Sequence, residues 1–205
     1  MQRATKIGDS IDAGNVRSLA LDQLCSSCLR KPPYDSIVKG LLLQFLKTDK
    51  YPEARALSAK SIGDLAAAKY SLDPEIVSAL TTAMHQDPDH NVRFNAANTL
   101  LTFCHEDTSE VLDTMISVAK AVPIPSAAEN KPICSLCPSP ASSLRGLATE
   151  AIGKRIRTGE FRDEKALAAL RSLSVDKDSL VRNAANVELA KVQELQQKGE
   201  KNFVF

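Results

Sequence analysis

Apolar and polar positions alternate along this chain with the spacing of helices that bury one face. An apolar residue followed by arginine recurs five times, each time with a small residue three positions later and a large apolar one seven positions later. Offsets of three, four, seven and eight residues lie on one side of an α-helix, so every copy predicts an amphipathic helix. The arginines of the five copies are Arg17, Arg55, Arg93, Arg145 and Arg182.

The distances between these arginines predict a repeat made of two helices. The intervals are 38, 38, 52 and 37 residues, which suits a helical hairpin, with a longer loop in the third interval. Apolar segments before the arginines supply the first helix of each pair. We predict these first helices at residues 35 to 47, 74 to 86, 108 to 121 and 164 to 174. Asp73 with Pro74 is typical of a helix start, and Asp107 with Glu110 is typical of a capping box.

An aspartate stands six residues before the arginine in three copies, as Asp49, Asp87 and Asp176. Together with the arginine, this pattern resembles HEAT repeats. The resemblance implies that aspartates and arginines of neighbouring repeats form a ladder of hydrogen-bonded charges. Ser139 in the fourth copy and Ile11 in the first replace the aspartate, so we expect the ladder to be interrupted there.

The resemblance extends from about residue 10 to residue 196 and predicts an all-α fold. We expect an α-solenoid (superhelix) of about five HEAT-type helical hairpins, with an incomplete first repeat, in a single domain of residues 1–205. Armadillo and tetratricopeptide arrays fit the intervals less well. The predicted repeats are 1–31, 32–70, 71–106, 107–160 with a proline-rich loop insertion at 121–140, and 161–198, followed by a tail at 199–205.

Charge and composition reduce the classes of function that are expected. The net charge is +1, the middle of the chain is acidic and there is no Trp, so a continuous basic footprint for nucleic acid is not expected. No apolar run is long enough to cross a bilayer, and no secretory signal is present. We therefore expect a cytoplasmic protein without a membrane partner, whose five cysteines are reduced.

Two Cys-x-x-Cys pairs occur, at residues 25–28 and 134–137. They lie three repeats apart, so one zinc ion cannot be held by both, and the first pair occupies positions that are small or apolar in other repeats. A zinc ion in the loop is an open hypothesis, with the ligands Cys134, Cys137, His85 and His90. We expect a protein that contains no metal ion and no cofactor.

Catalytic relatives of this architecture do not match. Deoxyhypusine hydroxylase uses several His-Glu dyads to hold two irons, whereas this chain has the single dyad His105–Glu106. Alkylpurine DNA glycosylases need a basic groove with aromatic residues. No phosphate-binding loop or nucleophile elbow is visible, and the sequence therefore predicts a protein that is not an enzyme.

Because no catalytic motif is visible, we expect the function of this protein to depend on binding at its surface. In HEAT arrays the second helices line the concave face, and positions one, five and nine after each arginine should point there. Phe94 is the one aromatic residue in this set, and aromatic anchors are common in protein-binding hot spots. We predict a scaffold that binds another protein or peptide; the alternatives are a small-molecule binder or lyase of the phycobilin-lyase type, recognisable by a deep polar pocket, and a protein that binds nucleic-acid backbone. The predicted partner-binding residues are Lys60, Asp64, Phe94, Asn98, Thr102, Glu150 and Lys154.

Overall fold

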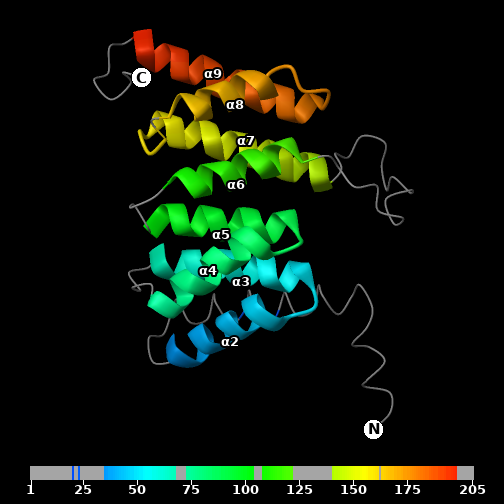
Figure 1. Cartoon of the computed structure of the whole chain (residues 1–205), viewed down its shortest axis with the longest axis vertical. Helices are drawn as coiled ribbons and strands as arrows, with labels where there is room; N and C mark the ends of the chain where they lie inside the picture. Colours follow the sequence, from blue (N-terminus) through cyan, green and yellow to red (C-terminus); the bar gives the residue numbers. More distant parts are fainter. Residues whose placement is uncertain are drawn as a thin grey trace, which may run out of the picture. The chain divides into compact units, whose positions relative to one another are not determined.

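The computed structural model describes residues 20, 23, 35–67, 73–103, 108–121, 140–161 and 163–197. All regular structure within these ranges is α-helical, as Figure 1 shows. Across the same ranges, no helix is both long and apolar enough to pass through a bilayer. The helices are α2 (Asp35–Thr48), α3 (Pro52–Ala67), α4 (Pro74–Gln86), α5 (His90–Phe103), α6 (Ser109–Lys120), α7 (Pro140–Arg157), α8 (Glu164–Leu173) and α9 (Ser179–Gln197).

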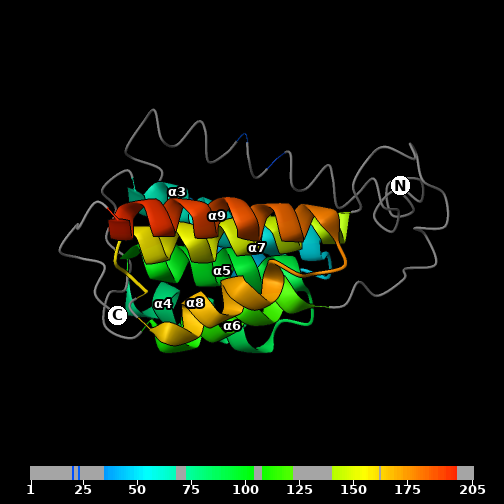
Figure 2. The same cartoon turned by 90° about the horizontal axis from the view of Figure 1, so that it is seen from above.

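The helices belong to two compact units, Met1–Asp107 and Thr108–Phe205. Within unit 1, α2 pairs with α3 and α4 with α5; within unit 2, α6 pairs with α7 and α8 with α9. The second helix of each hairpin packs closely on the second helix of the next, whereas the first helices meet over a much smaller area. First and second helices therefore form separate layers in each unit (Figure 2). Stacked helical hairpins of the solenoid type are confirmed; that all repeats form one domain stays a prediction.

The four first helices lie where the apolar spacing predicted them, and each end agrees to within one residue. The predicted caps hold only in part. Asp73 is the N-cap residue of α4 and Pro74 follows it, but the Asp73 carboxylate makes no capping bond and instead accepts one from Lys39 Nζ at 3.0 Å. This exposed carboxylate therefore binds a lysine of the preceding repeat in place of a backbone N–H of α4. The N-cap residue of α6 is Thr108, and Asp107 of the predicted capping box lies outside the described residues.

The repeated apolar positions form the core of each hairpin. In α5, Val92, Ala96 and Leu100 are each at most 4% exposed, and the equivalent residues of α3 are buried in the same way. Leu144 and Leu189 are the half-buried members of the pattern in unit 2. The pattern therefore identified the packed side of each second helix correctly.

Two glycines set how closely the second helices approach one another. A Cβ added to Gly63 of α3 would lie 2.7 Å from Thr99 Oγ1 of α5, and one added to Gly153 of α7 would lie 2.4 Å from Glu188 Cβ of α9. Both glycines stand eight residues after their repeat's arginine, and both partners stand six after theirs. The two units therefore share one packing register between successive second helices.

A glycine also ends α7. Gly159 has φ 75°, a conformation that side-chain-bearing residues rarely adopt, and its N–H donates to the carbonyl oxygen of Ile156 at 3.0 Å. The chain then turns, and the N–H of Glu160 donates to the carbonyl oxygen of Arg155 at 3.0 Å. This stop ends α7 directly after its basic last turn, which contains Lys154, Arg155 and Arg157.

Candidate functional site

A charge ladder joins successive repeats, as the resemblance implied. In unit 1, Arg55 donates from Nε and Nη2 to the two carboxylate oxygens of Asp87, at 2.7 and 2.9 Å. Arg55 Nη1 donates at 2.8 Å to the carbonyl oxygen of Asp49, in its own repeat. The Arg55 and Asp87 side chains are 13% and 7% exposed, and the hydrogen bond to Asp87 raises the pKa of Arg55, against the opposing effect of burial.

Unit 2 has the equivalent rung. Arg145 Nη2 donates to the carboxylate of Asp176, and its Nε donates to the carbonyl oxygen of Ala119 at 2.9 Å. The backbone carbonyl of Asp176 is taken by Arg182, whose Nη1 lies 2.7 Å away. Asp176 therefore links two consecutive repeats, through its carboxylate to one and through its carbonyl to the other.

The ladder aspartates also shape the turn between the two helices. The carboxylate of Asp87 accepts the N–H of Asp89 at 2.9 Å, and that of Asp176 accepts the N–H of Asp178 at 2.8 Å. Each second aspartate then accepts an N–H at the start of the following helix, as Asp178 does from Leu180 at 2.9 Å. An Asp-x-Asp sequence thus makes the turn and caps the second helix.

Arg93 uses its guanidinium within its own repeat. Its Nη1 donates to the carbonyl oxygen of Asp87 at 2.8 Å, and its Nη2 contacts Nδ1 of His90. Burial and the charge of Arg93 lower the pKa of His90, partly offset by Asp89. The predicted interruptions at Ser139 and Ile11 lie outside the described residues.

The predicted partner-binding residues of unit 1 lie on α3 and α5, which pack directly on each other. Lys60, Asp64 and Thr102 are exposed, and Phe94 and Asn98 are half-buried. Lys60 and Asp64 form an ion pair at 2.9 Å. We call these five residues the second-helix face of unit 1. It offers an aromatic side chain among amide, hydroxyl and paired charged groups.

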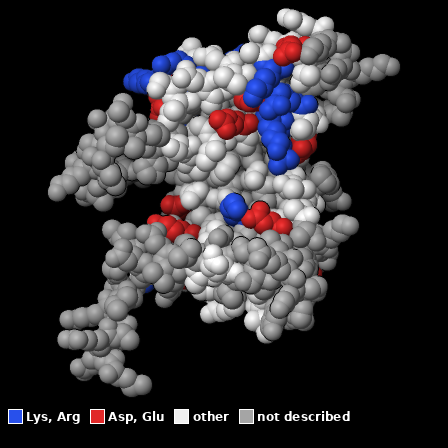
Figure 3. Space-filling view, turned by 180° about the vertical axis from the view of Figure 1, so that it is seen from behind, with Lys and Arg blue, Asp and Glu red and all other residues white. Residues whose placement is uncertain are grey.

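The remaining two predicted residues, Glu150 and Lys154, are exposed on α7. On the neighbouring helix α9, Val187 is 52% exposed and Lys191 is exposed. We call these four residues the second-helix face of unit 2. Figure 3, seen from behind, shows Lys and Arg side chains gathered in a column in unit 2, which agrees with the basic last turn of α7.

One feature beside this face was missed from the sequence. Glu188 of α9 is a buried carboxylate, 4% exposed, that accepts from Arg157 Nε at 2.9 Å and from Lys191 Nζ at 2.6 Å. The other repeats have Gln, Ser, Thr or Ala at this position. A lone acidic residue on the packed side of a helix was the signal that could have revealed it, because a buried carboxylate requires cationic partners.

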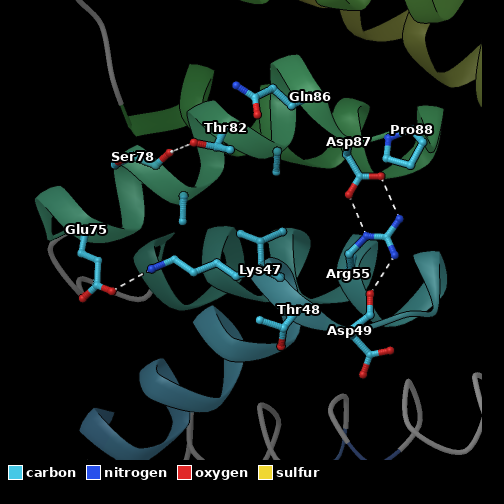
Figure 4. A pocket seen from close by; sticks show the side chains of 13 residues that line it. Lys47, Thr48, Asp49, Arg55, Glu75, Ser78, Thr82, Gln86, Asp87 and Pro88 are labelled. Carbon is cyan, nitrogen blue, oxygen red and sulfur yellow. Dashed lines mark hydrogen bonds and ion pairs between the residues drawn. The ribbon is translucent and has the colours of Figure 1, made fainter.

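An open cleft of about 610 Å³ lies in unit 1 between α2, the start of α3 and α4. Figure 4 shows two charge pairs in its lining: Lys47 donates to Glu75 at 2.8 Å, and Arg55 is bound to Asp87. Leu46, with alanines of α4, supplies apolar surface. These four charged groups therefore neutralise one another in pairs, whereas a small-molecule site is recognised by convergent polar groups that can bind a ligand.

Within the ranges that the structure describes, no group of three or more His, Cys, Asp or Glu side chains could hold a metal ion. Both Cys-x-x-Cys pairs, and the dyad His105–Glu106, lie outside those ranges. His85 and His90 lie inside them, on α4 and at the first residue of α5. The zinc hypothesis therefore stays a hypothesis.

Comparison with known proteins supports the resemblance to HEAT repeats over part of the chain. A protein-family model described as HEAT repeats matches residues 40–123, which begin within α2 and run just beyond the end of α6. No curated protein and no solved structure matches the chain. The match includes the first observed rung of the ladder, Arg55 with Asp87.

Proposed function

Since residues 40–123 match a HEAT-repeat model, we propose that the chain is a non-catalytic scaffold that binds a segment of another protein on the second-helix faces of its two units. One observation carries the proposal. In each unit the second helices pack tightly side by side, so exposed residues on them form a shared surface. Tight packing also makes the surface rigid, which lowers the entropy lost on binding.

The chemistry of the unit 1 face suits a protein segment. Phe94 retains exposed surface beside Asn98 and Thr102, and amide and hydroxyl groups can exchange hydrogen bonds with a peptide backbone. The ion pair between Lys60 and Asp64 is exposed, so each partner can turn to a charge on a bound chain at low cost. An aromatic anchor with such neighbours is typical of an interaction hot spot.

The two alternatives have less support. Small-molecule binding has its best place in the α2–α4 cleft, but the charged groups there neutralise each other. Binding of nucleic-acid backbone predicts strong, salt-dependent retention on DNA or RNA. The second-helix face of unit 1 carries one lysine, and that lysine is paired with Asp64.

Affinity purification of the tagged chain tests the proposal. We expect a specific partner to be recovered with the wild-type chain and lost with the double variant Phe94→Ala/Lys60→Glu. The matched control is Val175→Ala/Lys177→Glu, which makes the same kinds of change at two exposed residues of the α8–α9 turn. Equal recovery with both double variants would move the binding surface away from α3 and α5.

A further inference from the structure

The second-helix face of unit 2 and the adjacent Arg157 carry cations that have spare hydrogen-bonding capacity. Arg157 uses only Nε for its bond to Glu188, which leaves both Nη groups without an acceptor in the described part of the chain. Lys191 donates to the other oxygen of the same carboxylate, and its side chain is 46% exposed. Two cations therefore share one buried anion, and their outer sides face solvent.

Lys154 adds a third charge to this group. It is exposed, makes no ion pair with any described residue, and stands one helical turn before Arg157 on α7. Residues three apart on a helix are neighbours on its surface, so Lys154 and Arg157 lie close together. Glu150 precedes Lys154 by four residues, and the two form no ion pair with each other.

Apolar side chains lie along the same two helices. Val187 precedes Lys191 by four residues and is 52% exposed, and Leu147 precedes Lys154 by seven residues and is 53% exposed. Spacings of four and seven keep each pair on one side of its helix. Both α7 and α9 thus present an exposed apolar residue followed, toward the C-terminal end, by exposed positive charge.

We propose that this surface, made of Lys154, Arg157, Lys191, Val187 and Leu147, binds an acidic protein segment that carries an apolar side chain next to its carboxylates. Charge complementarity favours carboxylates, because the planar Nη groups of Arg157 can hold one with two parallel hydrogen bonds. Glu188 holds Arg157 and Lys191 in place beforehand, which reduces the conformational entropy lost on binding. This inference rests on the proposed scaffold function and names the class of partner for unit 2.

Fluorescence anisotropy with the full chain and a short labelled peptide of glutamate and leucine tests the inference. We expect saturable binding that weakens as salt is added, because exposed charges are screened. The double variant Lys154→Gln/Lys191→Gln should lose about tenfold or more in affinity, whereas Lys165→Gln/Lys177→Gln, which likewise removes two positive charges elsewhere in unit 2, should bind normally. Unchanged affinity in the double variant would overturn the proposal.

Further arms separate the other outcomes. Lys154→Gln alone is the variant least prone to misfold, because Lys154 has no ion-pair partner among the described residues, and it should still weaken binding. Equal binding of the same peptide with glutamine in place of glutamate would refute the electrostatic contribution. Tighter binding of a single-stranded oligonucleotide of equal charge would show that this surface binds nucleic acid and not an acidic protein segment. If the wild-type chain does not bind the peptide, but recovery of its partner still depends on Phe94 and Lys60, this inference is refuted and the proposed function is not.

Discussion

Arg55 of one repeat holds the carboxylate of Asp87 in the next with two hydrogen bonds, while its third bond goes to the turn of its own repeat. One side chain therefore fixes both the turn within a hairpin and the contact between hairpins. Because both partners are largely buried, neither can be removed without leaving the other with an unmatched polar group.

Arg55→Lys should lower the free energy of unfolding by about 2 to 4 kcal/mol, because lysine cannot reproduce the two-pronged geometry beside a buried carboxylate. Chemical denaturation followed by circular dichroism measures this. The matched control is Arg171→Lys: Arg171 forms an ion pair with Glu164 in which both side chains are 62% exposed, so the change should cost less than about 0.5 kcal/mol. Similar losses in the two variants would contradict a structural role for the ladder.

Gly153→Ala should destabilise unit 2 although alanine is the better helix former. The new Cβ would meet the Cβ of Glu188 at 2.4 Å, and such overpacking costs about 1 to 3 kcal/mol. Gly146→Ala in the same helix has nothing within 4 Å of the new Cβ and should be neutral or stabilising by up to about 1 kcal/mol. Thermal denaturation of the two variants separates these effects, and a stabilised Gly153→Ala would disprove the observed approach of α7 and α9.

His90 predicts a pH dependence of stability. Its pKa is lowered in the folded chain by burial and by Arg93, so the unfolded chain takes up a proton first as the pH falls. The stabilisation is therefore complete above the unfolded pKa of about 6.5 and is lost as the pH falls through the lower folded value. Wild type should lose more stability than His90→Gln between about pH 7 and pH 5.

Denaturation curves across that range measure the difference between the two proteins. Parallel pH profiles for wild type and His90→Gln would show that His90 does not account for the dependence.

Asp89 is the cap of α5, since its carboxylate accepts the N–H groups of Asn91 at 2.8 Å and Val92 at 3.1 Å. Asp89→Ala should cost about 1 kcal/mol, and Asp89→Asn, which keeps an acceptor oxygen, should cost less. Unfolding midpoints in urea give the comparison. Equal losses would mean that the charge of Asp89, rather than its hydrogen bonds, stabilises the turn.

Much of the fold followed from the sequence because one helical face repeats in every copy. The apolar position before each arginine, which is Val92 in α5, was predicted to face the core of its repeat. The spacing between the arginines predicted the hairpins. The partners of the ladder, Arg55 with Asp87, came from the resemblance and not from spacing. The capping bond expected of Asp73 could not be predicted reliably from the sequence. Whether its carboxylate accepts from a backbone N–H or from Lys39 depends on the position of a neighbouring repeat.

The candidate surfaces could be predicted only as positions on a helix. Periodicity assigns Lys60 and Lys154 to the same class of position, yet Lys60 is paired with Asp64 and Lys154 has no carboxylate partner among the described residues. Such differences depend on rotamers and on contacts between helices. The grouping of Arg157 and Lys191 around Glu188 required the packing of α9 on α7, which no local pattern contains.

We propose that the second helices, and not the first, present the binding surface. Two threonines of unit 1 allow a matched test: Thr102 on α5 and Thr82 on α4 are both exposed, and each donates to the carbonyl oxygen four residues earlier at 2.9 Å. A photo-crosslinking residue in place of each, followed by recovery of the partner found with the wild-type chain, measures which layer lies at the interface. If the second helices form the interface, crosslinks arise from position 102 and none from position 82; crosslinks from position 82 alone would show that the first helices bind the partner.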